Sequence, residues 1–290
     1  MNRFYKYLKS FDSTLLEYSK VIGKVLPVLA IIIFVYKLSH LDIDSLQIEF
    51  ELSRSIYLWL VLLLCFIINH VLDAIIWRYI LVKEGIVISI KAAMYMNWKS
   101  LLYSISTPSR IGEIPARRLL LKAKNDIKVY KSASIHYVFK PISFLFAFGL
   151  SYIIWKDHLS IINVLLIGSV SAIILNLLIP SIRKYVYLVV LNIFRIITYS
   201  IQHGVIVMLL GLFTIKFKLI NIFVLIHSLG ALIPHVFGTE IFMKSAIYEL
   251  IDINLLSWES FVLSVSLLWI MNIVLPALIA LGLKKHDYSS

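Results

Sequence analysis

The sequence predicts an all-α integral membrane protein with about six full transmembrane helices and two oppositely oriented re-entrant helical elements, arranged as an inverted repeat. Three observations carry this prediction. Of the 290 residues, 60% are hydrophobic and only 15% are charged, which is too little polar surface for a soluble domain. Long apolar runs recur along the chain. The Lys and Arg residues lie between these runs, so the net charge of +12 indicates loops facing anionic lipid and not a nucleic-acid partner.

Six runs approach or exceed the roughly 20 apolar residues that a membrane-crossing helix needs. They are Val21–Leu38, Ile56–Val82, Ser134–Trp155, Ile161–Pro180, Tyr185–Phe213 and Ser260–Leu283. The first follows a basic N-terminal segment, residues 1–20, and no small-residue cleavage site comes after it. We therefore expect an uncleaved first span and a single polytopic membrane domain over residues 1–290.

The distribution of charge predicts which side of the membrane each loop faces, because cytoplasmic loops are enriched in Lys and Arg. The N-terminus, Arg78–Lys91, Thr107–Lys131 and the tail 284–290 are basic and are expected in the cytoplasm. Leu41–Glu51 and Glu249–Glu259 carry acids and are expected outside. Both termini are therefore expected to be cytoplasmic.

Two segments, residues 86–131 and 219–251, are apolar but interrupted by polar residues. The first has cations on both sides of Ile86–Ser106, so a full crossing would leave one cationic cluster outside. We expect it to enter from the cytoplasmic face and return. The second begins and ends on the outer side in this scheme, so we expect it to enter from the opposite face.

The two segments also share a pattern: proline, three residues, glycine, a glutamate at once or one residue later, and a cation four residues after the glutamate. The shared positions are Pro108, Gly112, Glu113 and Arg117 in the first segment and Pro234, Gly238, Glu240 and Lys244 in the second. The two patterns start 126 residues apart, with three predicted spans between them. This arrangement is typical of the inverted repeats of transporters.

Each glutamate of this pattern has two interpretations. In the first, it stabilises a helix start through the helix dipole and pairs locally with its i+4 cation. In the second, the pair lines a polar cavity and exchanges partners with a charged headgroup, because irregular backbone and charges at membrane depth are tolerated only beside protein or water.

Asp73 and Arg195 are charged residues within predicted spans. An acid inside the membrane is a functional candidate, although a structural pair with Arg78 or Arg195 is equally compatible with the sequence. Arg195 lies about three turns into its span, too deep to snorkel, so we expect it to pair with Asp73 or Glu240.

Motifs for metal binding or catalysis are not found. The histidines lack metal-ligand spacing, Cys65 is the only cysteine, and no nucleophile-elbow context occurs. We expect no metal, no cofactor and no enzymatic activity. A lipid-directed glycosyl or phosphoryl transferase, with Glu113 or Asp73 as base, ranks last because no metal-binding carboxylate pair is present.

The run Trp77-Arg78-Tyr79, Asn97, and the motif from Pro108 through Arg110, Gly112 and Glu113 to Arg117 together resemble the lysylphosphatidylglycerol synthase transmembrane family. This family is also described as flippase-like and corresponds to the flippase part of bacterial multiple peptide resistance proteins. The later Pro234, Gly238 and Glu240 resemble its second motif, a glycine-containing turn before a glutamate. Two departures from the family pattern are Pro115 and a second turn with a single glycine.

The resemblance implies that the chain binds or moves charged-headgroup lipids or lipid-linked intermediates in a bacterial inner membrane. Synthase activity is not implied, since no soluble domain is expected after Leu283. Arg110, Arg117 and Arg118 are expected to attract an anionic headgroup, because Arg binds phosphate with two parallel hydrogen bonds. Glu113 and Glu240 would gate the cavity, and Asp73 and Arg195 would keep the path hydrated.

The main alternative is an accessory or scaffold protein that does not transport. It would use the same basic face to bind lipid-linked glycan precursors or a partner, such as a lipid-modifying enzyme or a glycosyltransferase. A protein of this kind would bind lipid without moving it between leaflets.

Overall fold

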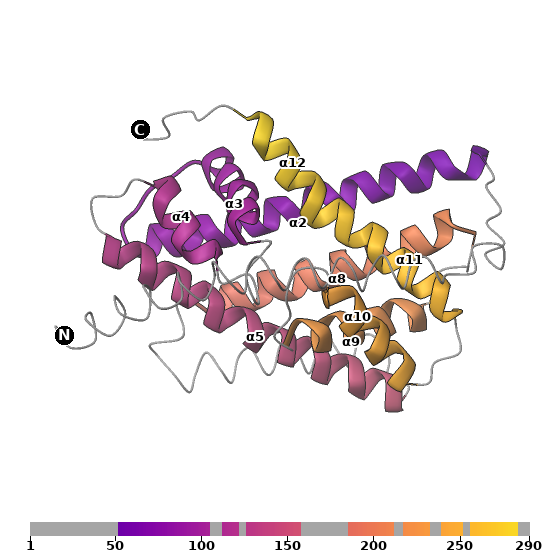
Figure 1. Ribbon diagram of the computed structural model, residues 1–290. Helices are drawn as coiled ribbons and strands as arrows, with labels where there is room; N and C mark the ends of the chain where they lie inside the picture. Colours follow the sequence, from indigo (N-terminus) through magenta and orange to yellow (C-terminus); the bar gives the residue numbers. More distant parts are fainter. Residues whose placement is uncertain are drawn as a thin grey trace.

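The computed structural model describes residues 52–104, 112–121, 126–157, 185–211, 217–232, 239–251 and 256–283. The regular structure within these ranges is entirely helical (Figure 1). Two predicted spans, Val21–Leu38 and Ile161–Pro180, lie outside the described residues, as do Arg110 and Gly238.

Four predicted spans are confirmed as helices long and apolar enough to cross a membrane. They are α2 (Leu52–Lys83), α5 (Asp126–Asp157), α8 (Val186–Leu209) and the run of α11 (Trp258–Trp269), the π-helix η3 (Ile270–Val274) and α12 (Leu275–Gly282). Helices α2, α8 and α5 lie beside one another, with the α11–α12 run across them (Figure 1).

Two helix starts differ from the sequence-based expectation. Helix α2 begins at Leu52 and not at Ile56, and α5 begins at Asp126 and not at Ser134. The extra residues 126–133 of α5, about two turns, take in the end of the basic stretch, where Lys128 and Lys131 are exposed. Hydropathy marks where an apolar run starts, whereas backbone hydrogen bonding carries a helix on into the polar zone.

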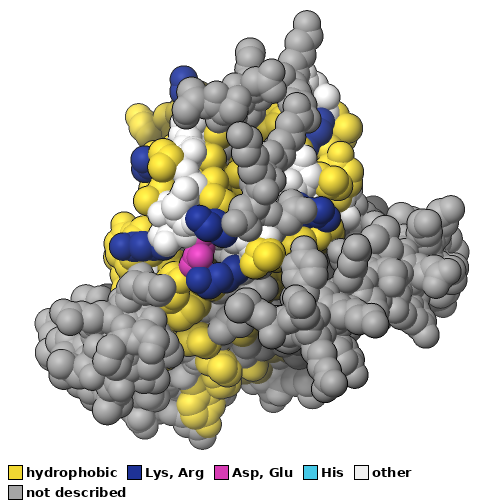
Figure 2. All heavy atoms as spheres, turned by 90° about the vertical axis from the view of Figure 1, so that its left-hand side faces the viewer, with side chains coloured by type: hydrophobic (Ala, Val, Ile, Leu, Met, Phe, Trp, Pro, Cys, Tyr) yellow, Lys and Arg dark blue, Asp and Glu magenta, His cyan; other side chains and the backbone are white. Residues whose placement is uncertain are grey.

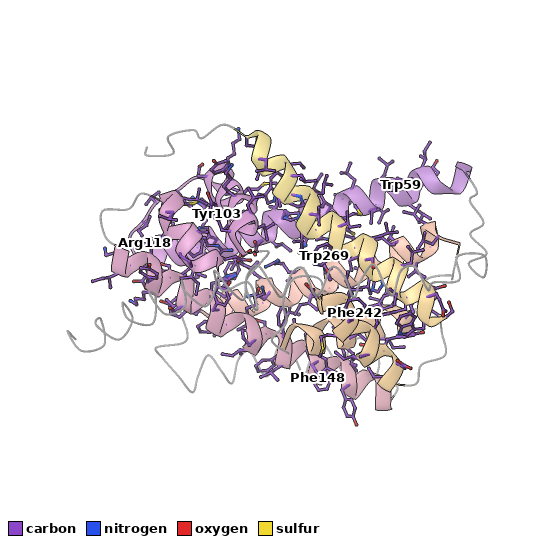
Figure 3. All side chains as sticks on the ribbon, viewed as in Figure 1. Trp59, Tyr103, Arg118, Phe148, Phe242 and Trp269 are labelled. Atoms are coloured by element: carbon purple, nitrogen blue, oxygen red, sulfur yellow. The ribbon has the colours of Figure 1, made fainter. Side chains whose placement is uncertain are left out.

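The outer faces of the bundle are apolar. Large side chains of α2, including Ile56, Tyr57 and Leu60, are between 60% and 73% exposed. Trp59 on α2 also points outward from the bundle (Figure 3). Exposed apolar area of this extent suits contact with lipid chains and is uncommon on a soluble protein.

Four short helices occupy the two segments that interrupt the spans. Helices α3 (Ile90–Ser104) and α4 (Glu113–Leu121) pack against each other, as do α9 (Phe217–Leu232) and α10 (Thr239–Leu250). At 9 to 16 residues, each is shorter than the roughly 20 residues of a full crossing. The described helices thus include two pairs of short helices at the places where the sequence predicts interruptions.

The turn between α2 and α3 depends on Gly85, whose φ is +80°. The Ile86 amide donates to the Leu81 carbonyl and the Gly85 amide donates to the Val82 carbonyl, which is a Schellman motif. A residue with a side chain would be strained at this φ. The turn sends α3 back along α2 and so brings Asn97 beside Asp73.

The end of the bundle where α2 ends and α5 begins is cationic. Lys83, Lys91, Lys128 and Lys131 are exposed there, and Lys131 pairs with Glu84 at 2.8 Å. Figure 2 looks onto this end and shows Lys and Arg side chains spread over it. Anionic lipid headgroups at a membrane surface attract a basic face of this kind, which lies next to apolar helix sides.

Candidate functional site: a charged cavity inside the bundle

A cavity of about 280 Å³ lies between the helices. Its lining comes from α2, α3, α4, α5, α8, α9, α10 and the π-helix. Among the described residues, the lining carries four cationic side chains and three carboxylates, which sum to a charge of +1 when the histidines are neutral. These residues are Arg117, Lys140, Arg195 and Lys244, and Asp73, Glu113 and Glu240. Charged groups inside a membrane bundle are costly unless they pair or meet water, and here the pairs converge on one space.

The first pair belongs to α4. Glu113 is the first residue of the helix, and its carboxylate accepts from Arg117 Nη2 at 3.0 Å, one turn later. Both side chains are at least 93% buried. The Arg117 guanidinium also lies over the Trp77 ring, 4.6 Å from its centre, which adds a cation–π contact. Glu113 and Arg117 are therefore paired locally and also line the cavity.

Arg117 has hydrogen-bonding capacity that the protein does not use. Among the described residues, none accepts from its Nε or its Nη1. Leaving buried N–H donors without an acceptor costs about 1–3 kcal/mol for a neutral group and more for a charged one. A guanidinium with N–H donors to spare is suited to bind a phosphate or carboxylate oxygen pair, and Arg117 is one of the residues that line the cavity.

The second pair belongs to α10. Glu240 lies in the first turn, and Lys244 Nζ donates to its Oε1 at 2.5 Å. Lys244 Nζ also lies 5.1 Å from the centre of the Tyr199 ring. Gly230 on α9 provides the space for this lysine, because a Cβ at Gly230 would come within 2.9 Å of Lys244 Cγ. The α9–α10 contact therefore needs a glycine at this position.

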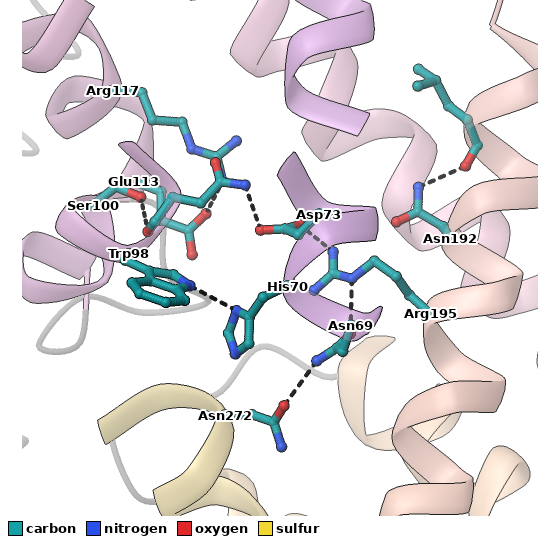
Figure 4. A network of polar contacts seen from close by, with 12 residues as sticks. Asn69, His70, Asp73, Trp98, Ser100, Glu113, Arg117, Asn192, Arg195 and Asn272 are labelled. Carbon is teal, nitrogen blue, oxygen red and sulfur yellow. Dashed lines mark hydrogen bonds and ion pairs between the residues drawn. The ribbon is translucent and has the colours of Figure 1, made fainter. Parts of the chain in front are cut away.

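The third pair joins two spans. Asp73 on α2 forms an ion pair with Arg195 on α8, one of the two partners that the sequence predicts for Arg195. Asn97 donates to the other Asp73 oxygen at 2.9 Å, and Arg195 Nε donates to Asn69 at 3.2 Å. Figure 4 shows Glu113 and Arg117 on one side of Asp73 and Arg195 on the other. Arg78, the other candidate partner of Asp73, instead donates to the Ile88 carbonyl at 3.0 Å.

The π-helix places an asparagine in this network. Asn272 accepts from Asn69 at 2.9 Å (Figure 4). Its amide nitrogen lies 2.9 Å from both Gln202 Oε1 and the Leu268 carbonyl. A π-turn inserts an extra residue into a helix, which rotates the following side chains, and such turns are frequent at functional sites. The buried amide of Asn272 thus connects the π-helix with α2 through Asn69 and with α8 through Gln202.

Six of the ten residues predicted as a site line this one cavity: Asp73, Glu113, Arg117, Arg195, Glu240 and Lys244. Arg118 does not, because one residue further along α4 it faces away and contacts Tyr130 at 3.2 Å. Gly112 precedes α4 and accepts from the Ala116 amide through its carbonyl, but it is not part of the lining. The remaining two, Arg110 and Gly238, lie outside the described residues.

The sequence-based site omits several residues of the lining. These are Asn69, His70, Asn97, Trp98, His136, Lys140, Asn192, Tyr199, His227 and Asn272. The signal that could have found most of them is a polar side chain within an apolar run. Hydropathy cannot indicate whether such a residue faces a cavity, a backbone carbonyl or a neighbouring helix.

The cavity brings three pairs of opposite charge together in one space. Within the described residues, no group of three or more His, Cys, Asp or Glu side chains is placed to hold a metal ion. Comparison with known proteins finds no family model, no curated protein and no solved structure that matches this chain. The resemblance to flippase-like proteins therefore rests on the motifs named above. A function for this chain has to be inferred from the geometry of the cavity.

Proposed function

We propose that this protein binds a charged-headgroup lipid, or a lipid-linked intermediate, and moves it across the bacterial inner membrane. The observation that carries the proposal is the cavity of about 280 Å³ among apolar, span-length helices, lined by three ion pairs. A cavity of this composition is unsuited to acyl chains but accommodates a polar headgroup whose chains remain in the surrounding lipid.

The contacts of Arg117 favour a lipid whose headgroup carries an anionic group. Its two open N–H donors and its stacking on Trp77 form a preorganised phosphate contact at the base of the cavity lining. The single net positive charge of the lining matches a headgroup with one negative charge, such as a phosphodiester. A bound monoanion would make the site neutral and so lower the cost of carrying charge through the membrane.

The two pairs at helix starts supply groups that can exchange partners. Glu113 and Arg117, and likewise Glu240 and Lys244, are paired within one helix turn. A headgroup phosphate competes with the glutamate for the cation, so binding at one pair releases a carboxylate toward the cavity. Passing the headgroup from the α4 pair to the α10 pair would move it between the two halves of the proposed inverted repeat.

Lipid movement in proteoliposomes tests the proposal. Vesicles of phosphatidylethanolamine and phosphatidylglycerol would carry trace NBD-labelled phosphatidylglycerol, and dithionite would report the fraction in the outer leaflet. We expect wild-type protein to make nearly all of the label accessible over time. Glu113→Gln is expected to slow this movement by at least about tenfold. The glutamine still bonds to Arg117, but it is neutral and so cannot compete with the headgroup phosphate for the guanidinium and release the lipid.

The matched control is Glu84→Gln. Glu84 also pairs with a cation, Lys131, but it lies on the cationic end of the bundle and outside the cavity. This variant is expected to move lipid at the wild-type rate. Unchanged movement in folded Glu113→Gln would refute the proposed role of the α4 pair.

A non-transporting accessory protein is the second candidate. The observation that favours it is that two of the three pairs are closed within single helix turns, which lets Arg117 hold a headgroup without any exchange. Retention of phosphatidylglycerol by the purified protein, together with no movement of the labelled lipid, would support this function over translocation.

A further inference from the structure

Two buried histidines form a hydrogen-bonded chain that reaches the cavity from the side of α11. His227 on α9 lines the cavity, and its Nε2 lies 3.1 Å from Nδ1 of His203 on α8. His203 Nε2 lies 2.8 Å from Ser264 Oγ on α11. All three side chains are at least 96% buried. The ion pairs of the cavity do not include these histidines, so lipid binding at those pairs does not account for the two buried imidazoles.

The direction of the hydrogen bonds follows from the serine. Ser264 Oγ lies 2.9 Å from the Phe261 carbonyl, which can only accept, and 2.8 Å from His203 Nε2, which can donate or accept. With the single serine proton assigned to the carbonyl, Ser264 Oγ accepts from His203. His203 must then carry its proton on Nε2, and its Nδ1 is an acceptor. His227 therefore donates through Nε2–H, and in its neutral form its Nδ1 has a lone pair and no proton.

That lone pair has no hydrogen-bond donor among the described residues. A buried acceptor without a donor is costly, and here it belongs to a side chain that lines the cavity. Protonation of Nδ1 makes it a donor that needs an acceptor, and the Glu240 carboxylate in the same lining can supply one. The His203 Nδ1 acceptor already stabilises the resulting imidazolium through the Nε2–H bond.

The groups around His227 show what a proton there would do. The titratable groups that interact with it are Tyr199 and His203 from α8 and Glu240 and Lys244 from α10, while Arg195 from α8 and His136 and Lys140 from α5 line the same cavity. His227 and Lys244 contact the same Tyr199 ring, with ring centres 4.8 Å apart for the histidine and Nζ 5.1 Å from the centre for the lysine. A positive His227 would repel Lys244 and attract Glu240, which weakens the pair on α10.

We infer that His227 is a proton-binding site coupled to the α10 ion pair, so that one proton enters the cavity together with one anionic headgroup. This inference depends on the proposed lipid movement. A hydronium ion transfers its proton to His227 Nδ1, leaving water, and the imidazolium carries one positive charge. Glu240 then turns toward the imidazolium, Lys244 is released toward the headgroup phosphate, and return of the proton to water restores the original pair.

Two aromatic side chains fix the orientation of the His203 ring between His227 and Ser264. Its ring stacks on Phe223 with centres 3.9 Å apart and meets the edge of Phe261 at 5.5 Å. These contacts prevent the ring from rotating away from His227 and Ser264. His203 and Ser264 are therefore positioning residues, and His227 is the residue that takes the proton.

A pH gradient across the proteoliposomes tests the coupling. With the same NBD-phosphatidylglycerol, the initial rate of inward movement is expected to rise by at least about fivefold when the outside is two pH units more acidic, the lower end of typical coupling between two sites. In His227→Gln the ratio of rates with and without the gradient is expected to be one. The Gln side chain retains an N–H that reaches His203, and it has no titratable nitrogen.

Two serines on α11 provide a matched pair. Ser264→Ala removes the contact that orients His203 and is expected to reduce the gradient response. Ser266→Ala removes a hydroxyl of the same kind, buried and bonded to the Val262 carbonyl at 2.7 Å, and is expected to retain the full response. Loss of the response in both variants would indicate a general effect of α11 and contradict the assigned chain.

A second measurement separates this inference from the proposed function. Solid-state NMR of ¹⁵N-histidine protein in nanodiscs of the same lipids, with signals assigned through His227→Gln, reports which nitrogen carries the proton. We expect His227 protonated at Nε2 at neutral pH and at both nitrogens on acidification. Lipid movement that ignores the gradient would overturn the coupling alone, whereas absence of movement would overturn the proposed function. An Nδ1-protonated His227 at neutral pH would overturn the site in either case.

Discussion

At the scale of residues, neighbouring positions in the sequence have different roles in the structure. Arg117 and Arg118 both belong to the basic motif, yet Arg117 is buried over Trp77 and Arg118 contacts Tyr130 outside the cavity. Successive residues of a helix point about 100° apart, so only one of two adjacent arginines can face the bundle interior. Of these two arginines, only Arg117 therefore lines the cavity.

The Asp73–Arg195 pair leads to a prediction about stability. Asp73→Asn and Arg195→Gln are each expected to lower the free energy of unfolding by about 2–3 kcal/mol, because each leaves a charge inside the bundle without its partner. The double variant should lose less than the sum of the two single variants. Unfolding in SDS would measure these free energies.

Arg78→Gln is the control for this cycle. Arg78 is exposed and contacts a backbone carbonyl, so its substitution is expected to lower the free energy of unfolding by less than about 1 kcal/mol. Additive losses in the double variant would mean that the two side chains do not stabilise each other.

At the scale of elements, the two short-helix pairs present their charged residues in the same way. Each pair ends in a helix whose first turn carries a glutamate that bonds to a cation one turn later. The carboxylate interacts favourably with the helix N-terminus, and its i+4 cation faces the same side. Approach of α9 to α10 then depends on Gly230, next to the stem of Lys244.

Substitution of Gly230 is therefore predicted to disturb the α9–α10 pair. Gly230→Ala would bring a methyl group within 2.9 Å of Lys244 Cγ and is expected to reduce stability by about 1–3 kcal/mol, the usual cost of overpacking. Thermal unfolding in nanodiscs would measure the change. Gly149→Ala on α5, where no atom lies within 4 Å of the added Cβ, is expected to be neutral or stabilising. Equal effects of the two changes would exclude the steric explanation.

At the scale of the whole molecule, the cavity and the cationic end belong to one arrangement. The cationic end lies where α2 ends and α5 begins, and the same two helices contribute Asp73, His136 and Lys140 to the cavity. This end of the bundle is thus cationic, while the exposed sides of its described helices are apolar. For the proposed topology, the cationic end faces the cytoplasm and α3–α4 enters and leaves from that side.

Side-specific labelling tests this topology in a Cys65→Ala background, since Cys65 is a free and buried thiol. Cysteines replacing Lys91 and Lys128, exposed residues before and after the α3–α4 pair, are expected to react from the same side of the membrane. Ser257→Cys is expected to react from the other side. Reaction of the Lys91 and Lys128 positions from opposite sides would contradict a re-entrant α3–α4 pair and the inverted repeat with it.

The sequence by itself determined what depends on local pattern. Hydropathy predicted α2, α5, α8 and the α11–α12 run, and the i,i+4 spacing predicted the pairs Glu113–Arg117 and Glu240–Lys244. Such features follow from helix geometry within one or a few turns, so they do not require knowledge of neighbouring helices.

Only the tertiary structure decided the contacts between helices. It paired Asp73 with Arg195 across 122 residues, placed Asn272 in a π-turn against Asn69, and joined His227 to Ser264 through His203. The physical reason is that all faces of a membrane helix can be apolar, so periodicity does not show which face meets which neighbour. Side-chain packing between helices selects those faces, and with them the cavity that unites the two predicted motifs.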